Sequence, residues 1–181
     1  MDTNINGVII REIYDNEHAE EYFEQQLERA LDVGYETIII EPNRLAEETA
    51  HWIKVGNCLH DCAVVFGLSS ICLSIMWNRN SQAFALSVPF TTVSVFCAGL
   101  YMISWQLDPC CKYQIASDTD KAKLKERAFE NRSSDFSEFV IFTSRSTSPT
   151  ILIRKDDTTR KIIHSAIALF AFTFTVIRFY K

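Results

Sequence analysis

The sequence lacks an excess of positive charge and the length for two catalytic domains. It has 181 residues, with 23 acidic against 18 basic side chains and a formal net charge of −5. Proteins that bind the phosphate backbone of nucleic acids normally carry a cationic excess. We therefore expect one modest folded unit, and no nucleic acid as a partner.

Familiar catalytic and targeting motifs are also missing. The sequence has no Gly-rich phosphate loop, no Gly-x-Ser-x-Gly elbow and no His-Glu-x-x-His helix. Its first residues do not place a basic stretch before an apolar run, so we do not expect a cleaved signal peptide. These patterns favour a protein that is not an enzyme and needs no cofactor. Any insertion into a membrane would be directed by internal segments.

Charge is distributed unevenly along the chain. Residues 1–60 hold 13 acidic and 4 basic side chains, whereas residues 62–105 hold a single charged side chain, Arg79. Charge returns between residues 106 and 161, and residues 162–177 are again uncharged. The partition indicates a soluble acidic arm followed by membrane segments.

The acidic arm, residues 1–54, has the pattern of a strand, a helix and a second strand. β-forming residues predict strands over Val8–Tyr14 and Thr37–Ile40. Between them, residues 17–33 place apolar side chains at helical spacing before Gly34, which predicts an amphipathic helix. Residues 44–54 have helical composition and predict a lead-in helix at the membrane surface.

Three apolar segments predict an α-helical membrane protein. Residues 62–77 and 83–105, within the region 55–105, are joined by about five polar residues and must form a two-span hairpin. The first segment is short for a bilayer, and burial in a soluble core is its alternative reading. Residues 162–181 have no polar face, which favours a third short span over an interfacial helix.

The polar segment 106–161 predicts two more strands, Phe139–Phe142 and Thr150–Arg154. We expect them to join the strands of the acidic arm in a small α/β polar unit at the open end of the hairpin. The alternative is that the strands remain separate. Ser117–Ser137 is rich in charge and poor in large apolar side chains, which predicts a mobile insertion.

The cysteines offer two candidate sites. Cys58-Leu-His-Asp-Cys62 resembles half of a zinc site but lacks a second ligand pair at a recognised spacing, so we expect no metal. Cys110 and Cys111 follow a turn at a membrane exit, where acylation, packing and redox roles all stay open.

Small residues spaced four apart predict close contact between helices. They occur as Ala63-x3-Gly67, Ser94-x3-Ala98 and Val95-x3-Gly99. Packing within the hairpin is the favoured interpretation, and formation of a homo-oligomer is the alternative.

Several strings together resemble the mitochondrial morphogenesis family that includes transmembrane protein 11. The matching strings follow the family order: Glu12–Tyr14, Ile40–Arg44, Glu48–His60, Ser104–Gln114, Arg154–Asp157, Arg160-Lys161, His164 and Ile167–Leu169. A shorter N-terminus and an extended polar stretch over Lys121–Ser137 depart from the family pattern.

The resemblance implies a multi-pass mitochondrial protein, generally of the inner membrane, that organises cristae. It implies partners rather than substrates: membrane lipids, a cristae-organising complex of the MICOS type and further copies of the chain. An outer-membrane adaptor for mitophagy or organelle-contact receptors is the alternative. The interaction candidates are the residues of the matching strings: Trp52, Gly56, Asn57, Cys58, His60, Trp105, Asp108, Pro109, Cys110, Cys111, Lys112, Tyr113, Arg154, Lys155, Asp156 and Asp157.

Two mechanisms fit these expectations. In the first, a short first span prefers thin or curved bilayer, because hydrophobic mismatch has an energetic cost. In the second, the acidic arm binds a basic partner segment. A thiol enzyme or transporter is a weaker third class, since no charged residue lies mid-span. Basic residues gather on the open side of the hairpin, which would place that side in the matrix.

Overall fold

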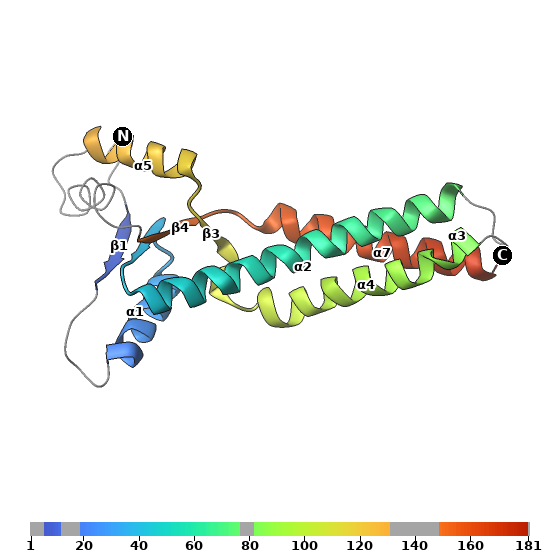
Figure 1. The fold of residues 1–181 in the computed structure, drawn as a ribbon, viewed down its shortest axis with the longest axis horizontal. Helices are drawn as coiled ribbons and strands as arrows, with labels where there is room; N and C mark the ends of the chain where they lie inside the picture. The colour runs from blue at the N-terminus through green and yellow to red at the C-terminus, as the bar shows by residue number, and fades with distance from the viewer. Residues whose placement is uncertain (1–5, 12–18, 77–81, 131–148, 181) are drawn as a thin grey trace. The chain divides into compact units, whose positions relative to one another are not determined.

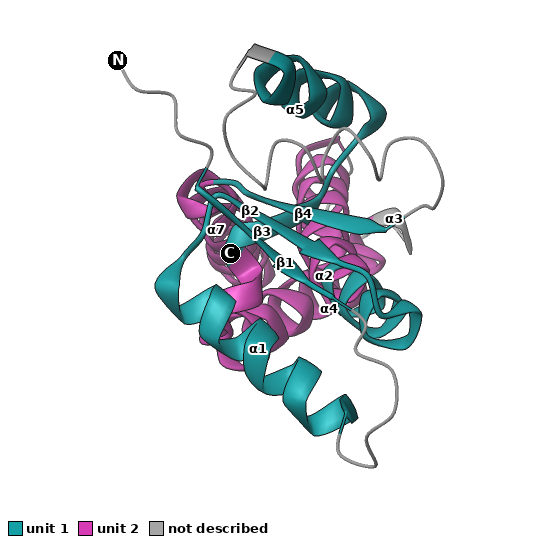
Figure 2. Cartoon of the chain, turned by 90° about the vertical axis from the view of Figure 1, so that its left-hand side faces the viewer, with its two compact units in different colours: residues 1–53, 112–155 teal, residues 54–111, 156–181 magenta. Residues whose placement is uncertain are grey.

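The structure is a computed structural model that describes residues 6–11, 19–76, 82–130 and 149–180 (Figure 1). The chain divides into two compact units (Figure 2). The first comprises residues 1–53 and 112–155, and the second comprises residues 54–111 and 156–181. Each unit is described by itself below.

The first unit is built on a four-stranded mixed sheet. Its strands are β1 (Gly7–Ile10), β2 (Thr37–Ile40), β3 (Tyr113–Ile115) and β4 (Thr150–Arg154), in the order β1-β2-β4-β3. β1 and β2 are parallel, and β4 is antiparallel to both β2 and β3. The predicted strands at residues 37–40 and 150–154 are confirmed. β1 ends earlier than predicted among the described residues, and Phe139–Phe142 lies outside them.

Helix α1 (Ala19–Val33) provides the crossover that two parallel neighbouring strands require. Its buried side chains recur at the spacing of one helix face, as predicted: Phe23, Leu27, Ala30 and Leu31. Figure 2 shows α1 and helix α5 (Asp118–Glu130) on opposite faces of the sheet. On the α5 face, Leu124 and Ala128 pack with Ile39 and Ile151.

The prediction of a mobile insertion over residues 117–137 is wrong for residues 118–130, which form α5. The Ser117 hydroxyl accepts from the Asp120 N–H at 3.2 Å, and the Asp120 carboxylate accepts from the Ser117 N–H at 3.3 Å. This reciprocal capping starts the helix. Hydrogen bonds from Lys155 and Ser117 also lower the pKa of Asp120 to about 2. Strand β3, beside it in the chain, was not predicted either.

Among the described residues of the second unit, three helices are long and apolar enough to cross a membrane. They are α2 (Asn43–Met76), which begins in the first unit, α4 (Ser87–Leu100) with its π-helical continuation Tyr101–Trp105, and α7 (Thr158–Tyr180). The prediction of a membrane α-helical protein is thus supported at this level. The short helix α3 (Gln82–Ala85) precedes α4.

Two predicted boundaries need correction. The lead-in helix and the first apolar segment are one helix of 34 residues, about 51 Å long at 1.5 Å per residue. The apolar segment within this helix, residues 62–77, keeps its predicted length, so the preference of a short first span for thin bilayer stays a prediction. The second apolar run is interrupted at Leu86, because Pro89 has no N–H to donate to the carbonyl of Ala85. Pro89 thus sits in the first turn of α4.

Side-chain contacts fix the directions of the three helices. Contacts between α2 and α7 join His60 to His164, Ser70 to Thr175 and Ser74 to Arg178, at sequence separations of 104, 105 and 104. A nearly constant separation means that α2 and α7 run parallel. Ser94 and Thr91 of α4 contact Ala63 and Ser70 of α2 in reverse order, so α4 is antiparallel to α2 (Figure 1).

Leu124→Ala should expose the α5 face of the sheet. The side chain is 7% exposed within the cluster that covers Ile39. We expect about 3 kcal/mol less protection for the β4 amides, measured by native-state hydrogen exchange. Lys123→Ala, on the exposed side of the same helix, is the control. Equal protection in both variants would show that α5 does not stabilise the sheet.

Candidate functional site: the buried polar contacts of the helix bundle

The predicted interaction residues are divided between the two units. Five of them lie in the first unit: Trp52, Lys112, Tyr113, Arg154 and Lys155. The others lie in the second unit: Gly56, Asn57, Cys58, His60, Trp105, Asp108, Pro109, Cys110, Cys111, Asp156 and Asp157.

In the first unit, the predicted residues hold the sheet and the turn before β2 together. The Tyr113 hydroxyl donates to the carbonyl of Tyr35 at 2.8 Å, and the Lys155 N–H donates to the carbonyl of Lys112 at 2.7 Å. The Arg154 guanidinium donates to the carbonyl of Gly34 at 2.9 Å. Gly34 ends α1 with a φ of 76°, which requires glycine.

In the second unit, the two strongest family strings meet where Trp105 packs on Gly56. Trp105 is 2% exposed, and a Cβ added at Gly56 would lie 2.2 Å from Cε2 of its indole. Glycine at this position of α2 therefore leaves the space that the indole fills. Gly56 and Trp105, two of the predicted interaction residues, therefore pack against each other within the chain.

A cluster of buried hydroxyls joins all three long helices. Ser70 of α2 lies 2.6 Å from the Thr91 hydroxyl of α4, which lies 3.0 Å from the Thr175 hydroxyl of α7. Ser70 also donates to the carbonyl of Ser87 at 2.9 Å. The three hydroxyl residues are at most 7% exposed. Hydrogen bonds between hydroxyls are a common source of helix association in apolar surroundings. We name Ser70, Thr91 and Thr175 the hydroxyl cluster.

The sequence analysis missed the hydroxyl cluster. Each of its members is a hydroxyl residue within an apolar run, and nothing else in the sequence pointed to it. The neighbouring Thr92 and Thr173 give the same signal, yet they are exposed and donate to carbonyls of their own helices. A threonine that bonds between helices can be told from one that bonds within its own helix only when the contacting helix faces are known.

The small residues pack within the bundle, as the favoured interpretation expected. Ala63, Ala98 and Ala168 form one buried cluster, and the Ser94 hydroxyl donates to the carbonyl of Ala63 at 2.7 Å. A Cβ at Gly67 would lie 2.6 Å from Ile167. By contrast, a Cβ at Gly99 would meet nothing within 4 Å.

The adjacent thiols are poorly placed for chemistry. Cys110 is 7% exposed and Cys111 is 2% exposed. Burial, reinforced by the charge of Asp108, raises the pKa of Cys110 to about 12. Because the thiolate is the nucleophile, the geometry favours packing over acylation or redox exchange.

The predicted half-site for zinc places two thiols one helical turn apart. Sγ of Cys58 lies 3.9 Å from Sγ of Cys62. In the described ranges, no group of three His, Cys, Asp or Glu side chains is arranged to hold a metal ion.

Two acidic candidates organise the start of α7. The Asp156 carboxylate accepts from the Thr158 N–H at 3.0 Å and from the Thr158 hydroxyl at 2.6 Å. These bonds hold the pKa of Asp156 below its usual range and cap the helix. Asp157 is paired with Lys161, at 2.5 Å between carboxylate and ammonium.

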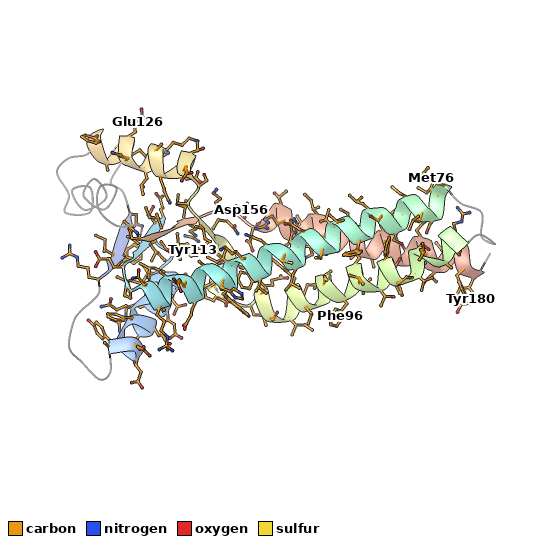
Figure 3. The ribbon with its side chains drawn as sticks, in the orientation of Figure 1. Met76, Phe96, Tyr113, Glu126, Asp156 and Tyr180 are labelled. Carbon is orange, nitrogen blue, oxygen red and sulfur yellow. The ribbon has the colours of Figure 1, made fainter. Side chains whose placement is uncertain are left out.

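Arg178 holds the other end of α7 to the last turns of α2. Its guanidinium donates to the carbonyl of Ser74 and lies 5.8 Å from the centre of the Phe84 ring. A cation is favourable at the C-terminal end of a helix. Figure 3 places Met76 and Tyr180 at the same end of the bundle. The two helices thus pack along most of their shared length.

Comparisons with known proteins point to one family. The sequence model of the mitochondrial morphogenesis regulators matches residues 6–180. "Transmembrane protein 11, mitochondrial" of Danio rerio is 40% identical over 177 residues, which cover 96% of this chain and 84% of that protein. The Homo sapiens protein of the same name is 40% identical over 173 residues, with 96% and 82% covered. No solved structure matches the chain.

Gly56→Ala should weaken the bundle, because the added methyl group overlaps the Trp105 ring. We expect a loss of about 1–3 kcal/mol in unfolding free energy, measured by steric trapping or denaturant in detergent micelles. Gly99→Ala is the matched control, since open space surrounds that position. Similar losses in the two variants would contradict the packing of Trp105 on Gly56.

Thr91→Val removes the central member of the hydroxyl cluster without changing side-chain shape. We expect a loss of about 0.6–1.7 kcal/mol, from the average to the largest value measured for hydrogen bonds between membrane helices. Thr92→Val removes an exposed hydroxyl that bonds only within its own helix in this structure, and should change stability less. The same unfolding measurement compares the two. A larger loss for Thr92→Val would contradict the assignment.

Proposed function

Because the chain belongs to the mitochondrial morphogenesis regulator family, we propose that it is a non-enzymatic scaffold of the mitochondrial inner membrane that organises cristae. The family description supports a role in mitochondrial morphogenesis, and the relatives are named as mitochondrial transmembrane proteins. The inner membrane, the cristae and the absence of catalysis are the parts that we add.

The hydroxyl cluster is the observation that carries the proposal. Three buried hydroxyls make contacts between α2, α4 and α7, and Ser70 also donates at 2.9 Å to the carbonyl of Ser87, the first residue of α4. Hydrogen bonds of this kind hold apolar helices together in one rigid bundle. A fixed membrane body suits a scaffold, which must hold its shape while partners and lipids adjust.

In this proposal all three long helices cross the bilayer. Three crossings place the polar residues before α2 and the residues after α7 on opposite sides. The polar first unit then faces one compartment, and we assign to it the contacts with a cristae-organising complex of the MICOS type. Membrane lipids and further copies of the chain are the partners of the spanning helices. Nucleic acid has no place in this scheme.

An outer-membrane adaptor for mitophagy or organelle-contact receptors is the second candidate. The side of α1 that faces away from the sheet carries exposed acidic residues: Glu20, Glu21, Glu24 and Glu28. Such a surface suits a basic partner segment. In this alternative the acidic surface, rather than the bundle, carries the function.

Cells that lack the endogenous relative can test the scaffold. We expect Thr91→Val combined with Thr175→Val to restore cristae poorly at matched protein abundance, because both changes break contacts between helices. The control pair, Thr92→Val with Thr173→Val, removes hydroxyls that bond to their own helices and should restore cristae fully. Electron microscopy of cristae junctions is the measurement. Full restoration by the first pair would contradict the scaffold.

The same cells separate the two candidates. Glu24→Gln with Glu28→Gln neutralises part of the acidic surface and leaves the buried face of α1 intact. A scaffold should still restore cristae with this variant. Loss of restoration, together with loss of a co-purifying basic partner, would favour the adaptor.

A further inference from the structure

Two imidazoles form the contact between α2 and α7 nearest to the start of α7. Nδ1 of His60 lies 3.1 Å from Nδ1 of His164, and the ring planes are at 75°. His164 is fully buried, and Tyr101 packs edge-on against it with ring centres 4.6 Å apart. His60 is partly exposed.

The hydrogen bonds fix the tautomers of the pair. Nε2 of His164 is buried and has no hydrogen-bond partner in the described part of the chain, so a proton there would lack an acceptor. The neutral His164 ring therefore carries its proton on Nδ1, which faces Nδ1 of His60. Nδ1 of His60 must then be an acceptor, because two N–H groups cannot face each other at 3.1 Å.

Neither imidazole can take up a further proton without leaving an N–H group that lacks an acceptor. A proton on His60 would occupy Nδ1 and point at the N–H of His164. A proton on His164 would occupy Nε2, which is buried without an acceptor among the described residues. A buried N–H that lacks an acceptor loses its hydrogen bond to water without replacement.

The surrounding charges also disfavour protonation of the two imidazoles. On α7, Arg160 lies near both imidazoles, while Lys161 is near His164 and is paired with Asp157. On α2, Asp61 is the one acidic neighbour found for His60 in the described structure. From the π-helix, the Tyr101 hydroxyl adds no charge, and the Cys111 thiol lies near that hydroxyl. Two imidazolium ions would face each other and the Arg160 cation, which is unfavourable.

We propose that the neutral contact between His60 and His164 couples pH to the packing of α7 on α2. The neutral pair holds the start of α7. Proton uptake, which begins at about pH 6.5 for an ordinary imidazole, breaks the contact and loosens α7. The folded contact binds fewer protons than two free imidazoles, so its stability is present above this pH and is lost as pH falls. The inference goes beyond the scaffold role and does not depend on it.

The tautomers provide the first test. Full-length protein with ¹⁵N-labelled histidine, in phosphatidylcholine nanodiscs, can be observed by solid-state NMR. At pH 7.5 we expect a proton on Nδ1 of His164 and on Nε2 of His60, with a ring-to-ring cross-peak. At pH 5.5 the cross-peak should vanish. Identical tautomers at pH 7.5, or an unchanged cross-peak at pH 5.5, would overturn the proposal.

Hydrogen exchange provides the second test. After correction for intrinsic rates, protection of the amides of residues 163–168 should fall about fivefold from pH 6.5 to 5.5 for each proton that the contact excludes, because a free imidazole is already half protonated at about pH 6.5. His51→Gln, at an exposed position of α2, should keep this fall. His60→Gln with His164→Gln should remove it. The proposal fails if the wild-type chain shows no fall, or if the double variant keeps it. Where the double variant loosens α7 at both pH values, the NMR result decides.

Discussion

Hydrogen bonding inside an apolar helix bundle is the constraint on which the second unit depends. A buried hydroxyl in such surroundings must find a partner, and Ser70, Thr91 and Thr175 find each other across three helices. The register of α2, α4 and α7 in this structure makes these contacts together. That register also brings Trp105 onto Gly56 and Arg178 to the carbonyl of Ser74. The apolar side chains favour burial or lipid, but they accept many registers.

The sequence predicted the helices of this bundle better than their contacts. Apolar runs over residues 62–77, 83–105 and 162–181 indicate where helices lie, because burial in a bilayer requires long uncharged segments. The same uniformity hides which faces meet. Ser70 and Ser69 are neighbours in the same run, yet only Ser70 is buried at the centre of the hydroxyl cluster. The hydroxyl contacts between helices were therefore beyond the reach of periodicity, whereas the four-residue spacing of small residues did predict close packing at Ala63 and Ala98.

In the first unit, the elements that were predicted correctly are those with a clear local pattern of apolar residues. Thr37–Ile40 and Thr150–Arg154 are rich in β-branched residues and form β2 and β4 as predicted. Helix α5 was missed because its many charges hide a buried face of two side chains, Leu124 and Ala128. Its signal was the capping pair of Ser117 and Asp120. The strings that match the family include residues in contact with each other, such as Gly56 and Trp105. These contacts lie within the chain. Surfaces that bind other proteins stay a prediction.

The sidedness of the two chain ends tests the central claim, that α2, α4 and α7 cross one bilayer as a parallel and antiparallel bundle. Tags before Asp2 and after Lys181 can be exposed to protease on intact mitochondria, after rupture of the outer membrane and after full lysis. Three crossings predict that the two tags are cleaved at different steps. Cleavage of both tags at the same step would place both ends on one side and contradict the account.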